Sequence, residues 1–200
     1  PKPDVIIVND EDLTYAKVRF DRESMDVAAA RLGDFDASLT QLLILGTLWD
    51  TVRDGQRPAQ DYITTVLDNC AAVTHSSGLL SQMRQLETAV GAYLSPEARA
   101  EAHTSSADRF AQLRAMGPAG TDQAFQFVRG FIKHASSQAQ ISQLQSWLDA
   151  TGDTVRGITI DTDLTWEIII ALAAHDAIDD SAITAMTNTD PSATGARQAA

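Results

Sequence analysis

The sequence predicts a mainly α-helical protein in which a series of helices follows a short β-hairpin. Residues 5–8 are a β-branched run, and residues 13–20 alternate with a period of two. These two runs flank the polar cluster at residues 9–12, so residues 5–20 favour a hairpin. From Asp21 onward the apolar residues recur mostly at spacings of three and four, which is the period of a helix. The chain is therefore expected to pass from one hairpin into helices.

Capping residues divide the remainder into about nine helices joined by short turns. Each expected start has a side chain or a proline that favours this position, and the expected stops have glycine or polar residues. In chain order, the starts lie at Asp21, at Asp34 or Asp36, at Pro58, after the break His75–Gly78, at Ser95–Glu97, at Thr121, after Ser136–Ser137, at Asp161 or Asp163, and at Asp179–Asp180. The stops include Gly33, Asp54–Gly55, Met116 before the loop Gly117–Gly120, the longer connection Gly152–Thr159, and Met186. Residues 190–200 start one further helical segment.

Short connections make sequential helices antiparallel neighbours. Many such pairs in series favour a HEAT-like antiparallel α-α superhelical array, whose concave face is commonly a binding surface. No repeat motif recurs at a fixed period, so this expectation rests on the lengths of helices and turns. A lone hairpin is marginal in water. Residues 1–20 are therefore interpreted as the last strands of a truncated β-sandwich domain, and residues 21–200 as a helical repeat domain that is incomplete at its C-terminus.

The composition is that of an acidic globular protein. The chain has 15 Lys and Arg against 27 Asp and Glu, which gives a net charge of −12. Such a surface repels phosphate backbones and anionic lipids, so neither nucleic acid nor a membrane is an expected partner. No apolar run approaches the ~18 residues of a membrane span, and the N-terminus has no secretory signal. A cytoplasmic location is expected.

The residues alone predict no catalytic, cofactor-binding or metal-binding residue. Cys70 is the single cysteine and is interpreted as a core residue, with His75 as the only nearby base. None of the four histidines has a second one at a spacing that would place two zinc ligands on one helix face. The acidic pairs Asp10/Asp12 and Asp179/Asp180 are interpreted as turn and cap residues, although acid–base or calcium roles are conceivable for such pairs. His175 and Asp179 are too few ligands for zinc, and the segment from Trp49 to Asp54 is expected to form an interhelical hydrogen-bonding cluster.

Three stretches of the chain carry a resemblance to a known family. Residues 8–24 (VNDEDLTYAKVRFDRES) resemble the junction between the β-sandwich and the C-terminal helical domain in the aminopeptidase N family of zinc metallopeptidases. The sequence of this stretch is especially similar to that of the actinobacterial branch of the family. LWDTVRDGQRPAQDY resembles the second and third helices of that domain. Residues 146–183, together with TDPSATGARQAA, resemble its later helices. The resemblance covers about residues 5–200.

The resemblance implies a piece of a larger enzyme. In the family, a zinc ion bound by an HExxH motif activates water in a catalytic domain, and a helical cap encloses the chamber and limits access to short peptides. No residue of the zinc site matches a position in this chain. The resemblance thus implies a fragment with no cofactor of its own, whose parent enzyme binds zinc. The fragment itself is expected to be inactive.

The implied partners are the catalytic and β-sandwich domains of the same parent chain, and peptide substrates. A homodimer formed through the hairpin is a further expectation, because an unpaired strand edge can pair with another copy. The alternative function is a stand-alone helical-repeat adaptor that binds a peptide or protein on its concave face. The residues that line a substrate channel are not predicted.

Overall fold

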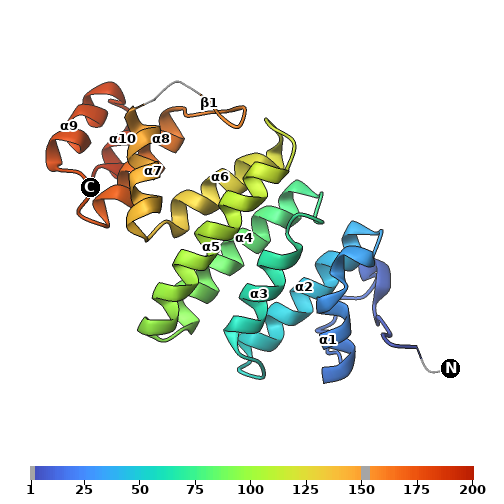
Figure 1. Cartoon of the computed structure of the whole chain (residues 1–200). Coiled ribbons are helices and arrows are strands. Elements are labelled where there is room, and N and C mark those ends of the chain that lie inside the picture. The colour runs from blue at the N-terminus through green and yellow to red at the C-terminus, as the bar shows by residue number, and fades with distance from the viewer. Residues whose placement is uncertain (1–2, 150–153) are drawn as a thin grey trace. The chain divides into compact units, whose positions relative to one another are not determined.

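The computed structural model describes residues 3–149 and 154–200, and most of these residues are helical (Figure 1). The mainly α prediction is therefore confirmed. Within these ranges the α-helices are α1 (Arg22–Ala30), α2 (Ser38–Arg53), α3 (Ala59–Asn69), α4 (Ser76–Tyr93), α5 (Pro96–Met116), α6 (Asp122–His134), α7 (Gln138–Asp149), α8 (Thr162–Ala173), α9 (Asp180–Thr189) and α10 (Ala193–Gln198). Short 3-10 turns lie at η1 (Asp10–Asp12) and η2 (Leu32–Asp34), and one hairpin pairs β1 (Thr154–Val155) with β2 (Ile158–Thr159).

The chain divides into two compact units, an N-terminal unit of residues 1–99 and a C-terminal unit of residues 100–200. Each unit has its own buried residues, and each is described by itself. The HEAT-like array and the domain boundaries at residues 20 and 21 stay predictions. No helix in the described part of the chain is long and apolar enough to cross a membrane.

In the N-terminal unit, α2 packs against α1, α3 and α4, and α3 packs against α4. An aromatic cluster lies among these helices: the Trp49 ring is 5.1 Å from that of Tyr62 and 5.8 Å from that of Tyr93, measured between centroids. The Tyr62 hydroxyl donates to Gln85 Oε1 at 2.5 Å, and burial raises the pKa of Tyr62. Tyr62 therefore stays neutral and joins α3 to α4 by a hydrogen bond inside the core.

The N-terminal hairpin predicted for Val5–Phe20 is wrong. The turn forms, since Asn9 donates to the Thr14 carbonyl at 2.8 Å and accepts from the Thr14 N–H at 2.9 Å. The flanking residues do not pair as strands within the described range 3–20. Leu13 and Tyr15 are exposed to solvent, at 81% for Leu13, so no apolar face covers the two arms. A hairpin without a packed face is marginal, and here period-two alternation alone did not form one.

Several predicted helix ends in the N-terminal unit are correct, but the starts of α2 and α4 differ. α4 begins at Ser76, inside the predicted break His75–Gly78, because His75 serves as its N-cap. Asp21 caps α1, where its side chain accepts from the Ser24 N–H at 3.0 Å. Ala37 precedes α2, in place of the predicted Asp34 or Asp36. Asp34 belongs instead to η2 and accepts from Arg31 Nε at 2.7 Å. The short-range pair with arginine thus occupies the carboxylate that the sequence suggested as a cap.

In the C-terminal unit, α8 packs against α6, α7, α9 and α10. Trp166 of α8 is buried at 1% exposure, and its indole N–H donates to Asp190 Oδ2 at 2.9 Å. This hydrogen bond lowers the pKa of Asp190 further, after the larger effect of the Ser192 side chain. A small cluster forms around Trp166 with Leu148, Ile169, Ile178, Ile183, Met186 and Ala199. α9 and α10 are thereby held to the rest of the unit.

The β1–β2 hairpin lies in the connection predicted for Gly152–Thr159, of which residues 152 and 153 fall outside the described residues. Arg156 and Gly157 form its turn, with φ angles of 54° and 78°. Positive φ at both central residues is typical of a type I′ hairpin turn, which suits the twist of the strands. β-branched residues lie on both sides of the turn, but each strand has two residues, which is too short a run for a periodic signal in the sequence.

Helix starts in the C-terminal unit follow the predicted caps. Thr121 accepts from the Ala124 N–H at 3.1 Å at the start of α6. Asp161, the first of the two predicted candidates, accepts from the Leu164 N–H at 3.0 Å at the start of α8. The acidic cap also suits the positive end of the helix dipole.

Candidate functional site

The residues that the sequence suggested for chemistry have structural roles. Cys70 is fully buried at the end of α3, as predicted for a core residue. His75 is the N-cap of α4, where its Nδ1 accepts from the Gly78 N–H at 3.4 Å. A nucleophile must be reachable by substrate and polarised by a base. A fully buried thiol and a histidine that caps a helix do not meet these requirements.

The acidic pairs are likewise turn and cap residues. Asp12 accepts from Asn9 Nδ2 at 3.1 Å, and Asp10 accepts from the Thr40 hydroxyl at 3.1 Å. Asp179 caps α9 and accepts from the N–H groups of Ser181 and Ala182. The Ser181 side chain, followed by the two N–H groups, lowers the pKa of Asp179. These carboxylates are therefore occupied by local hydrogen bonds.

The cluster expected between helices at Trp49–Asp54 is organised differently. Asp54, at the end of α2, accepts from Lys17 Nζ at 2.6 and 2.8 Å and pairs with Arg19. The hydrogen bond from Lys17 is the main cause of the lowered pKa of Asp54. Both cations belong to the extended segment before α1 and not to a helix. The prediction of an interhelical cluster is thus wrong at Asp54. The segment before α1 lies at the end of α2, so its two cations reach Asp54 and anchor the segment there.

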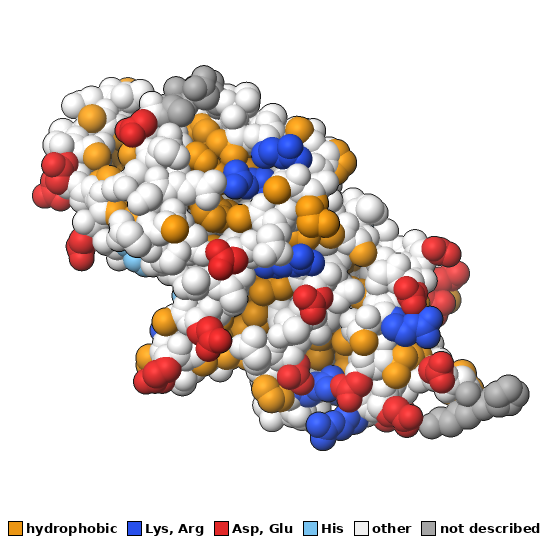
Figure 2. Space-filling model, in the orientation of Figure 1, with side chains coloured by type: hydrophobic (Ala, Val, Ile, Leu, Met, Phe, Trp, Pro, Cys, Tyr) orange, Lys and Arg blue, Asp and Glu red, His pale blue; other side chains and the backbone are white. Residues whose placement is uncertain are grey.

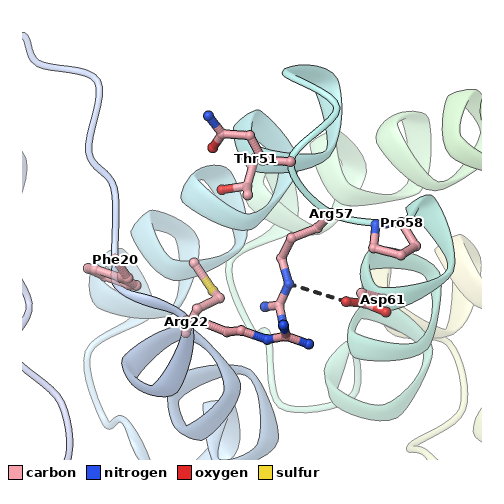
Figure 3. Close-up of a pocket in the computed structure, with 8 residues that line it drawn as sticks. Phe20, Arg22, Thr51, Arg57, Pro58 and Asp61 are labelled. Atoms are coloured by element: carbon pink, nitrogen blue, oxygen red, sulfur yellow. Dashed lines mark ion pairs between the residues drawn. The ribbon is translucent and has the colours of Figure 1, made fainter.

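A pocket of about 320 Å³ lies in the N-terminal unit where α1, the end of α2 and the start of α3 meet (Figure 3). Phe20, Met25 and Pro58 supply its apolar surface. The remaining lining residues are polar and include two arginines: Arg22, Thr51, Gln56, Arg57 and Asp61. The pocket is the most enclosed of those whose lining residues are described in this unit, and it is therefore the candidate functional site.

Arg57 is the central charge of this pocket. It is only 16% exposed, and it pairs with Asp26 on α1 and with Asp61 on α3, where Nε lies 3.2 Å from Oδ2. Arg22, on the first turn of α1, extends its guanidinium toward Arg57 in Figure 3. Arg57 is neutralised by its two aspartates, whereas Arg22 is exposed. The guanidinium of Arg22 can therefore bind a polar or anionic group that enters the pocket. Among the lining residues of the pocket, Asp61 is held in an ion pair with Arg57.

The described part of the chain contains no group of side chains that could bind a metal ion. Within residues 3–149 and 154–200, no three His, Cys, Asp or Glu side chains lie together in a way that could hold an ion. A catalytic zinc site needs three protein ligands. The described residues therefore do not fit a zinc ion.

A comparison with protein families shows to which group the chain is related. The sequence profile described as "ERAP1-like C-terminal domain" matches residues 5–200. The chain belongs to this family. The match covers both compact units, so the family unit includes the described helices from α1 to α10.

A curated relative supports the same assignment. The chain is 36% identical over all of its 200 residues to aminopeptidase N of Streptomyces lividans. It spans 23% of the length of that relative, and the matched part is the C-terminal one. The resemblance to the C-terminal region of aminopeptidase N is thus confirmed.

Arg57 was not singled out from the sequence, because an arginine next to a proline before a helix resembles any exposed turn.

Proposed function

We propose that this chain is a non-catalytic C-terminal domain of a zinc-dependent aminopeptidase, which removes N-terminal residues from peptides. In this proposal the helices cap the catalytic chamber and limit access of substrates. The supporting observation is the 36% identity that runs through the whole chain yet covers 23% of a much longer aminopeptidase N. A match of this kind favours a domain of a larger enzyme over a free-standing adaptor, and no observation favours the adaptor.

The zinc ion of the proposed enzyme belongs outside this chain. Zinc would supply an activated water for hydrolysis in the catalytic domain. The described residues offer no set of three ligands for it. We accordingly assign no chemical step to them, and their proposed role is to shape and restrict the space through which peptides pass.

The segment before α1 supports a junction with a preceding domain. Lys17 and Arg19 fix its end to Asp54, whereas Leu13 and Tyr15 have no apolar cover. Exposed large apolar side chains on a tethered segment suit burial by a neighbouring protein surface. We propose that the β-sandwich domain of the same parent chain covers them. In the isolated chain, which lacks that domain, we propose instead that two copies pair through this segment. Contact with peptide substrates and a cytoplasmic location of the parent enzyme are also proposed.

The purified 200-residue chain is predicted to have no peptidase activity. Amino-acid 4-nitroanilides, with and without added zinc, should be hydrolysed at the rate of the buffer blank, because no zinc ligands or activated nucleophile converge in the described residues. Release of 4-nitroaniline followed by absorbance measures this. Zinc-dependent turnover that co-purifies with the chain and disappears with a chelator would contradict the proposal.

A further inference from the structure

Arg156 covers the C-terminal end of α5. Its Nε donates to the Arg114 carbonyl at 3.1 Å, and its Nη2 donates to the carbonyls of Ala115 at 2.8 Å and Gly117 at 2.9 Å. The carbonyls of Arg114 and Ala115 belong to the negative end of the helix, where carbonyl groups lack partners inside the helix, and Gly117 follows directly after it. The hairpin turn is held in place as well, because the Gly120 N–H donates to the Arg156 carbonyl at 3.0 Å. Arg156 is thereby fixed, while its Nη1 has no acceptor in the described residues.

Arg114, on the last turn of α5, lies over two aromatic rings. Its guanidinium carbon is 4.8 Å from the centroid of Trp147 and 5.6 Å from that of Phe131. This stacking holds the plane of the guanidinium but supplies no hydrogen-bond acceptor. The Arg114 Nε is buried and has no hydrogen-bond partner in the described residues. Buried polar groups are nearly always paired, so a charged donor of this kind needs an explanation such as a bound ion.

The two arginines lie close together, since the Arg156 Nε donates to the Arg114 carbonyl, and no carboxylate among the described residues pairs with either of them. Burial lowers the pKa of Arg114, and the nearby charge of Arg156 lowers it further. In the described part of the chain neither arginine forms an ion pair, whereas Arg57 and Arg129 each pair with acidic residues. Figure 2 shows basic and hydrophobic side chains next to each other over the region where Figure 1 places the hairpin and the end of α5. The chain as a whole has a net charge of −12, so a local concentration of positive charge differs from its overall composition.

We propose that Arg114 and Arg156 form an oxyanion-binding site that takes a carboxylate or a phosphate group. The guanidinium of Arg114 offers its unpaired N–H groups, that of Arg156 offers Nη1, and guanidinium groups bind such oxyanions through paired hydrogen bonds. This site does not depend on the proposed function.

The test uses the full 200-residue chain with inorganic phosphate and acetate as separate probes. Each probe is added in increasing concentration, and sodium chloride at equal ionic strength serves as the control. The midpoint of thermal unfolding and the NMR signal of the Arg114 Nε–H are followed. A saturable rise of the midpoint together with a shift of this signal is expected in at least one arm. A response to acetate identifies a carboxylate site, and a response to phosphate alone identifies a phosphate site.

Variants separate this site from general salt effects. Arg114→Met keeps the bulk of the side chain and should weaken binding at least about tenfold, because it removes the charged donor. Arg156→Met should weaken it as well. Arg84→Met, at an exposed position on α4, is the matched control and should bind like the parent chain. Equal responses of the parent chain and Arg114→Met, or no response beyond sodium chloride in both arms, would overturn the proposal. Circular dichroism checks that each variant is folded.

Discussion

Replacing Gly130 by alanine is expected to destabilise the C-terminal unit by about 1–3 kcal/mol, as overpacking of a core does. A Cβ atom at this position in α6 would lie 2.8 Å from two carbons of the Phe110 ring. Phe110 is fully buried, and its ring stacks with those of Phe127 and His134 at 6.1 and 5.9 Å between centroids. The ring cannot move aside without disturbing these neighbours. Urea unfolding followed by circular dichroism measures the loss.

The matched control is Gly91→Ala on α4. A Cβ atom there meets nothing within 4 Å, and the position is exposed. Alanine should therefore stabilise the helix by about 0.5–1 kcal/mol, because it restricts the unfolded chain. Opposite signs for the two substitutions are the expected result. If both substitutions stabilised the protein, the close approach of α5 and α6 at Gly130 would be wrong.

The second large effect is a loss of stability in mild acid that depends on His134. Its Nδ1 lies 3.2 Å from Nδ1 of His103, so one of the two must carry the shared proton. Burial, followed by the charges of His103 and Lys133, lowers the pKa of His134 from 6.5 to about 3. The unfolded chain binds a proton at this residue below pH 6.5, whereas the folded chain does not until about pH 3. Stability from this residue is thus complete above pH 6.5 and falls as the pH is lowered through this window.

Between pH 7.5 and pH 5, the free energy of unfolding should fall by about 1.5–2 kcal/mol, since each pH unit below 6.5 costs up to about 1.4 kcal/mol per proton. Aspartates with lowered pKa values, such as Asp54 and Asp179, titrate below this range. The urea midpoint measured at several pH values in this range tests the prediction. His134→Gln should flatten the profile, and His175→Gln, at an exposed position, should leave it unchanged. A parent profile that is flat, or equally steep in His134→Gln, would contradict this account.

The helices could be predicted from the sequence because their ends are determined locally. Asp21, Thr121, Asp161 and Asp179 each accept hydrogen bonds from N–H groups two or three residues ahead, so a short stretch of sequence contains the whole interaction. The predicted hairpin at residues 5–20 was wrong because strand pairing also needs a packed face, which alternation does not guarantee. The hairpin at β1–β2 was missed because each strand has two residues, too few for a periodic signal.

The polar contacts of the unit interiors could not be predicted, because they join residues far apart in the chain. Gln140 is buried and donates to the Thr104 carbonyl at 3.0 Å and to Asp108 at 2.7 Å, more than 30 residues away. Arg57 reaches Asp26 on α1, and Arg156 reaches the end of α5. Spacing in a single sequence contains no information on such pairs. The sequence therefore identified the family through its motifs, while the pocket around Arg57 and the basic pair at Arg114 and Arg156 required the structure.

The central claim is that these helices restrict access to a catalytic site located elsewhere in a longer enzyme. The most direct test compares the intact parent aminopeptidase with a form that ends before Asp21. Both are assayed on an amino-acid 4-nitroanilide and on peptides of increasing length, and kcat/KM is measured for each. We predict that the shortened enzyme still hydrolyses the anilide and no longer discriminates against long peptides. An unchanged preference for short peptides in the shortened enzyme would contradict the claim.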